Sequence, residues 1–132
     1  EVNGVLRIFD YKTVKVKPAD MRISNWDMIV SDDKYSKAFQ LLMFAYFYLK
    51  NNSSGNMYAV KLSDLNALES GIISFKNLGN GFLKFAKKDK PGAWAKKNTL
   101  ITQETINSFK TELKRLILEI CNPDFPFTEK EI

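Results

Sequence analysis

The sequence predicts a mixed α/β domain in which a central sheet is flanked by two helices. Three observations predict it: an alternating run at 4–13, a nearly continuous apolar run at 34–50, and apolar residues at helical spacing near the end of the chain. The strand–helix–strands–helix order is typical of a layered α/β structure. With 132 residues, the chain is about one domain long, and we expect residues 1–132 to form a single domain.

The first expected strand is GVLRIFDYKT, residues 4–13. Successive residues of a strand point to opposite faces, so Asp10 and Lys12 share a face with Leu6 and Ile8. The other face carries the remaining side chains, Val5, Arg7, Phe9 and Tyr11. A carboxylate and an ammonium therefore stand side by side at the end of an otherwise apolar face.

A polar connection broken by Pro18 follows, with a short extended piece expected near residues 28–30. Ser31, Asp32 and Asp33 are N-cap candidates for the helix over 34–50. Since that helix is apolar almost all round, we expect it to be buried against a sheet.

The second half of the chain predicts more strands and one more helix. Strands are expected near residues 58–61, 70–76 and 81–88, the last after a GNG turn. Thr102 caps a final helix that runs to about residue 121. Its apolar residues recur at helical spacing: Ile106, Phe109, Leu113, Leu116, Ile117 and Ile120. The tail after this helix is loop-like.

The composition excludes several classes of chemistry. The chain has no histidine and a single cysteine, Cys121, which excludes Ser-His-Asp catalysis, Cys-His catalysis and an intramolecular disulfide. Any metal must be held by oxygens, which favours magnesium, manganese or calcium. No signal segment or membrane-spanning run is present, so we expect a soluble, cytoplasmic protein without a membrane partner.

Two interpretations of Asp10 and Lys12 follow from the residues alone. The first is an ion pair at the end of a strand, solvated or matched to a neighbouring strand. The second is a site for metal-assisted phosphodiester hydrolysis, in which Asp10 holds a divalent metal while Lys12 orients water or stabilises charge on a phosphate.

The segment RIFDYKT resembles the hydrophobic–hydrophobic–D-Y-K-T motif of RecB-type nucleases in the PD-(D/E)XK superfamily. In that family a helix carrying Q-x-x-x-Y follows, and FQLLMFAY stands at the corresponding place here. GIISFKNLGNGFLKF and the last helix before NPDFPF also resemble the C-terminal part of RecB- and AddB-type exonuclease domains. The resemblance implies a restriction-endonuclease-like fold with a mixed central sheet flanked by helices.

The resemblance also implies roles for individual residues. Asp10 would be a metal ligand for Mg²⁺ or Mn²⁺, with the backbone carbonyl of Tyr11 as a second ligand. Lys12 would be the catalytic lysine. Gln40 would position the lysine or the DNA backbone, although the residues alone equally allow a buried glutamine bonded to nearby backbone.

The sequence departs from the family pattern at several places. The motif tyrosine after Gln40 is Phe44, and Val14 replaces the glycine that commonly follows D-Y-K-T. The family's other metal-binding Asp lies on a preceding strand. We therefore expect the N-terminal strands and helix of the fold to be missing, so that the chain is the C-terminal portion of a nuclease domain with half a metal site. The sheet edge left exposed would be able to pair with another copy.

A basic segment, KFAKKDKPGAWAKK, is a candidate nucleic-acid contact, with lysines on phosphates and a tryptophan stacked on a base. Its residues are Lys84, Lys87, Lys88, Trp94, Lys96 and Lys97. The alternative is a solvated loop whose tryptophan caps the core.

Two functions follow from these observations. The first is a magnesium-dependent exodeoxyribonuclease domain for DNA recombination and repair that works with a helicase domain or subunit, the 132-residue piece itself being weak or inactive. The second is a DNA-binding or scaffold domain that keeps the nuclease fold after losing its site. Asp10 together with Lys12 favours the first, whereas Phe44 and Val14 favour the second.

Overall fold

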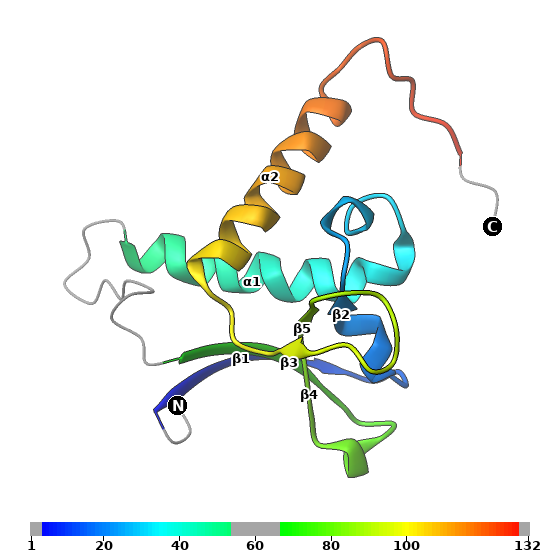
Figure 1. Ribbon diagram of the computed structural model, residues 1–132. Helices are drawn as coiled ribbons and strands as arrows, with labels where there is room; N and C mark the ends of the chain where they lie inside the picture. Colours follow the sequence, from blue (N-terminus) through cyan, green and yellow to red (C-terminus); the bar gives the residue numbers. More distant parts are fainter. Residues whose placement is uncertain (1–3, 54–66, 130–132) are drawn as a thin grey trace.

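The computed structural model describes residues 4–53 and 67–129. This part contains two three-stranded mixed sheets and two long helices (Figure 1). The first sheet has the order β1–β3–β4, with the bounds Val5–Lys12, Ala67–Ser74 and Phe82–Lys84. The second has the order β2–β5–β6, with the bounds Arg22–Ile23, Ala86–Lys88 and Lys97–Asn98. The prediction of a mixed α/β fold is confirmed.

The single central sheet expected from the sequence is wrong, and Phe85 shows why. The run from β4 to β5 changes sheet at this residue, whose side chain is fully buried. Its backbone N–H donates to the carbonyl of Ser70 at 2.8 Å. The strand expected over 81–88 is therefore two short strands that belong to different sheets.

Strands β1 and β3 are parallel and are connected through helix α1 (Ser36–Ser53). A tight turn joins only antiparallel strands, so parallel neighbours need a longer crossover such as a helix. The helix begins two residues later than expected, since a 3₁₀ turn at Asp33–Tyr35 precedes it. The side chain of Asp32 accepts a hydrogen bond from the backbone of Lys34 in that turn. Among the strands of the described residues, β1 forms one edge of its sheet.

The faces predicted for the first strand are confirmed. The face of β1 and β3 that packs on α1, here called the inner face, contributes Leu68 and Ile72 to the core alongside Leu41. The hydroxyl of Ser70 on the same face donates to the carbonyl of Leu41 at 3.2 Å. Because the strands are parallel and in register, the other face, here called the outer face, carries Arg7 beside its partner on β3.

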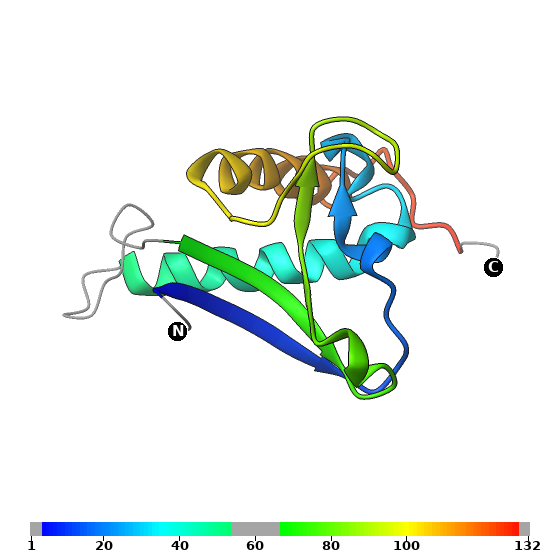
Figure 2. The ribbon, with the colours of Figure 1, turned by 60° about the horizontal axis from the view of Figure 1, so that its bottom comes forward.

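Helix α2 (Gln103–Ile120) lies beyond α1, so that the layers are sheet, α1 and α2 (Figures 1 and 2). The predicted cap is confirmed, because Thr102 Oγ1 accepts from the N–H of Thr105. Phe109 is fully buried and meets Phe39 of α1 edge to face, with 5.4 Å between the ring centroids.

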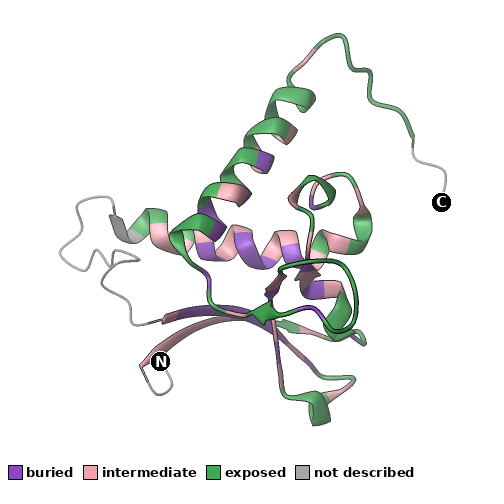
Figure 3. Cartoon of the chain, in the orientation of Figure 1, coloured by how far each residue is buried: buried purple, intermediate pink, exposed green. Residues whose placement is uncertain are grey.

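The apolar stripe of α2 extends further than its packing. Ile117 is 50% exposed and Ile120 is 51% exposed, since the C-terminal half of the helix projects beyond α1 (Figures 1 and 3). The helix predicted from this spacing is present, but only the first part of its apolar stripe is packed in the core. The tail that follows has no helix or strand up to residue 129.

Two further expectations have different outcomes. The extended piece expected at 28–30 is wrong: a 3₁₀ turn at Trp26–Met28 stands there, capped by the side chain of Asn25. The strand expected at 58–61 lies outside the described residues. The strand expected at 70–76 corresponds to β3, which begins three residues earlier.

Candidate functional site

The ammonium of Lys12 lies between a carboxylate and an amide at the end of β1. Its Nζ donates to Oε1 of Gln40 at 2.8 Å and lies 2.8 Å from Oδ2 of Asp10. Asp10 and Lys12 extend from the inner face, and Gln40 comes from the second turn of α1. The structure therefore brings together the three residues predicted for catalysis, from two elements that are separate in sequence.

This cluster is partly open to solvent. The side chains of Asp10 and Lys12 are about a quarter exposed, at 25% and 26%. Oδ2 of Asp10 is itself inaccessible and accepts no hydrogen bond, because the nearby ammonium is an ion-pair partner without hydrogen-bond alignment. The ion pair with the Lys12 ammonium offsets part of the cost of burying this carboxylate oxygen.

The oxygen atoms at this cluster are of the chemical type that binds hard divalent cations. They are the Asp10 carboxylate and, from the expected ligand set, the backbone carbonyl of Tyr11. The Tyr11 side chain is exposed on the outer face, so only its backbone is available on the Asp10 side. Within residues 4–53 and 67–129, no group of three acidic or cysteine side chains could hold a metal. The described residues thus supply one carboxylate.

The six residues predicted to contact nucleic acid separate into two groups. Lys84 Nζ donates to Glu69 at 2.9 Å and Lys87 pairs with Glu104 at 3.0 Å, while Lys88 donates to the carbonyl of Gly92. These three ammonium groups are already engaged within the chain.

The other three residues are exposed: Trp94 and Lys96 lie near the end of the connection between β5 and β6, and Lys97 is the first residue of β6. Trp94 is 99% exposed, so the idea that it caps the core is wrong; its neighbour Ala95 is the buried residue of this segment. A fully exposed indole ring is free to stack on a ligand.

Glu69 is a charged site that the sequence did not suggest. It is only 5% exposed, and its carboxylate accepts hydrogen bonds from Arg7 Nε at 3.1 Å, Lys84 Nζ at 2.9 Å and Thr99 Oγ1 at 3.2 Å. Burial raises the pKa of this carboxyl, but the hydrogen bonds and the charge of Lys84 outweigh burial and hold it below its ordinary value. The feature that identifies this site is the register of the parallel β1–β3 pair, which places Arg7 opposite Glu69.

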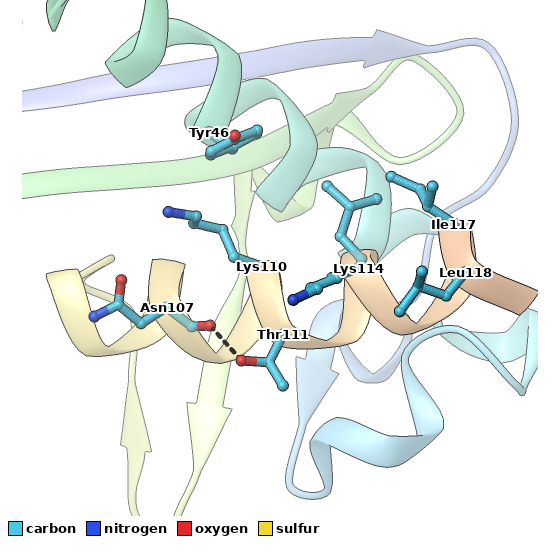
Figure 4. A pocket seen from close by; sticks show the side chains of 8 residues that line it. Tyr46, Asn107, Lys110, Thr111, Lys114, Ile117 and Leu118 are labelled. Carbon is cyan, nitrogen blue, oxygen red and sulfur yellow. Dashed lines mark hydrogen bonds between the residues drawn. The ribbon is translucent and has the colours of Figure 1, made fainter.

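A groove of about 530 Å³ lies between α1 and the projecting half of α2. Figure 4 shows Tyr46 of α1 across from Lys110, Lys114 and Ile117 of α2. None of the residues predicted for catalysis lines it, and α1 stands between it and the sheet (Figure 1). The groove is therefore distinct from the Asp10–Lys12 cluster.

No protein family, curated protein or solved structure matches the chain. Among the described residues, no helix combines the length and the hydropathy that a membrane crossing requires. Helix α1, the more apolar of the two, contacts the first sheet on one side and α2 on the other.

Proposed function

We propose that the protein is a metal-dependent DNA nuclease domain of the PD-(D/E)XK kind, an exodeoxyribonuclease that hydrolyses phosphodiester bonds in recombination and repair. One observation carries the proposal: Lys12 Nζ lies 2.8 Å from both Asp10 and Gln40. These three residues belong to the D-Y-K-T and glutamine-helix motifs, which lie apart in sequence. Their meeting in space is what that pair of motifs requires.

Each residue has a defined chemical task in this proposal. A bound Mg²⁺ or Mn²⁺ would lower the pKa of a water and neutralise charge on a phosphate oxygen. The Asp10 carboxylate would hold the cation, together with the Tyr11 carbonyl. An ammonium has three N–H donors. Gln40 accepts one of those of Lys12. In the proposed reaction, this bond would hold the ammonium where it can meet a water or a phosphate oxygen.

The fold and the partners belong to the same proposal. The β1–α1–β3 unit and the helices that cover its inner face are compatible with a restriction-endonuclease-like fold. A metal centre of ordinary strength needs at least one more acidic ligand, which we infer comes from outside the described residues. A helicase domain or subunit would present the DNA, in the cytoplasm.

A second candidate is a DNA-binding or scaffold domain that keeps the fold without the activity. The Asp10–Lys12 ion pair supports it, because the ammonium occupies the side of the carboxylate that a cation would need. Phe44, one turn after Gln40 on α1, lacks the hydroxyl of the motif tyrosine. Under this candidate the cluster is structural.

The test is a titration of Mg²⁺ and Mn²⁺ into the 132-residue chain and into a version extended upstream, with linear single- and double-stranded DNA as substrates. We expect cleavage by the extended version, abolished by Asp10→Asn and by Lys12→Gln. Lys110→Gln on α2 is the matched control and retains activity. DNA binding without cleavage in both versions would favour the scaffold candidate.

A further inference from the structure

The outer face of the first sheet carries an unbroken row of side chains, here called the outer aromatic face. It consists of Arg7, Phe82, Phe9, Tyr11 and Phe75, in that order along the face. The Arg7 guanidinium lies 5.4 Å from the Phe82 ring centroid. The next centroid separations along the row are 6.2, 5.4 and 5.4 Å. Each ring therefore touches the next.

This row is open to solvent. Phe9, Tyr11 and Phe75 are 46%, 56% and 55% exposed. In Figures 1 and 2, no described helix covers the side of β1 and β3 that faces away from α1. Single exposed apolar residues are ordinary, whereas a contiguous cluster of large ones marks a binding surface.

Gly71 on β3 makes room for this surface. A Cβ atom placed there would lie 2.6 Å from Cε2 of Phe82 and 2.5 Å from the carbonyl oxygen of Leu83. The missing side chain lets the Phe82 ring lie against β3, where it meets Arg7 and Phe9. The row therefore depends on the glycine at position 71, because only a residue without a Cβ lets the Phe82 ring approach β3 this closely.

The charge beside the row favours a polyanion. Arg7 and Lys84 share a single buried carboxylate, that of Glu69, so this group of three carries one net positive charge. The side chains of both cations are about one third exposed, at 32% and 33%. Within the described residues, Arg7 bonds Glu69 through Nε alone, which leaves its two Nη groups for a phosphate.

We propose that the outer aromatic face binds single-stranded nucleic acid, with bases stacked on Phe9, Tyr11 and Phe75 and a phosphate at Arg7. The Tyr11 and Phe75 rings are parallel to within 10° and already form a stack, which a base can extend. The net positive charge of the Arg7–Glu69–Lys84 group at the end of the row favours a polyanion over an uncharged, apolar protein surface.

This inference rests on the proposed function, because it takes the nuclease's substrate as the ligand. Asp10 and Lys12 flank Tyr11 in β1 and point to the opposite face. Since β1 is an edge of the sheet that residues 4–53 and 67–129 form, a flexible strand held on the outer face has a short route around that edge to the cluster.

The experiment measures the fluorescence anisotropy of a labelled 12-nucleotide oligo(dT) with the protein in EDTA and low salt, so that no cleavage occurs. We expect a double variant, Phe9→Leu with Phe75→Leu, to lose roughly tenfold or more in affinity, because leucine keeps the apolar volume and removes the stacking ring. Phe127→Leu is the matched control: this phenylalanine is 83% exposed on the C-terminal tail, away from the sheet, and its variant should bind like the wild type (Figure 1).

Other outcomes decide against the proposal. Equal affinity in the double variant, or no oligonucleotide binding by the wild type, overturns it. A wild type that instead dimerises through this face, with leucine tolerated, identifies a protein interface. Should the double variant fail to fold, Phe9→Trp and Phe75→Trp keep the ring and must bind at least as well as the wild type. The assay in EDTA measures binding alone, so a protein that binds the oligonucleotide but cleaves no DNA with Mg²⁺ or Mn²⁺ keeps this proposal and rejects the nuclease proposal separately.

Discussion

Oε1 of Gln40 lies 2.8 Å from Nζ of Lys12, the same distance that separates this ammonium from Oδ2 of Asp10. The first contact joins a helix to a strand, and the second joins two positions of one strand. A lysine on a flexible four-carbon stem is thereby confined to one place. The orientation of the ammonium depends on how α1 packs on the inner face.

Replacing Gln40 by methionine tests this dependence. The variant keeps the length of the side chain and removes the acceptor, so we expect a loss of about 1–2 kcal/mol in the free energy of unfolding, as for a hydrogen bond to a charged group. Urea denaturation measures it. Gln103→Met, at an exposed position on α2, is the control and should change stability by less than about 0.5 kcal/mol. Equal losses in the two variants would mean that the Lys12–Gln40 bond adds nothing.

Glu69 predicts a pH dependence of stability. Its folded pKa lies below its ordinary value, so its ionised form stabilises the fold at neutral pH, and this contribution is lost as the pH falls through the folded pKa. Glu69→Gln should therefore be less stable than the wild type by about 1–3 kcal/mol at pH 7. The difference should hold down to about pH 5 and shrink below the ordinary glutamate pKa of about 4.3.

Urea titrations at several pH values between 7 and 3 follow this difference. Glu104→Gln is the control, because Glu104 forms a more exposed ion pair with Lys87. Its stability should follow the wild type at all pH values. If the stability difference between the wild type and Glu69→Gln instead grew as the pH fell, the folded pKa of Glu69 would not be lowered, and the prediction would be rejected.

Gly71→Ala should destabilise the first sheet. The added methyl would overlap the backbone oxygen of Leu83, which cannot move without disturbing the β3–β4 pairing. We expect a loss of about 1–3 kcal/mol, measured by thermal or urea unfolding. Gly79→Ala is the matched control, because a Cβ there has no atom within 4 Å. Similar stabilities for the two variants would show that β4 shifts freely.

The two halves of α2 should respond differently to truncation. Phe109→Ala removes a fully buried ring and should cost about 3–5 kcal/mol. Ile120→Ala, at a half-exposed position, should change stability by about 0.5 kcal/mol or less. Circular dichroism during urea unfolding measures both. A large loss at Ile120 would indicate that the last turn of the helix is packed after all.

Local pattern explains which elements the sequence could predict. The alternation in β1, the N-cap at Thr102 and the apolar run of α1 are each properties of neighbouring residues. The three residues predicted for catalysis came from motifs, and the structure places them together. The catalytic roles assigned to them remain predictions.

What the sequence missed depends on distant partners. The division of the strands into two sheets turns on Phe85, whose burial is decided by the packing of the whole domain. Glu69 could be identified only from the β1–β3 register, which joins residues 62 positions apart. The apolar spacing of α2 does not reveal where its packing on α1 ends, so it could not show that Ile117 is half exposed.

The parallel pairing of β1 with β3 also constrains how the chain is made. As the polypeptide leaves the ribosome, β1 emerges first, yet its partner in the described part of the chain follows only after α1. During that interval the apolar and aromatic side chains of β1 are unshielded, which is the condition that recruits chaperones. We therefore expect the domain to fold late in synthesis, and nascent chains that end before residue 67 to stay sensitive to protease.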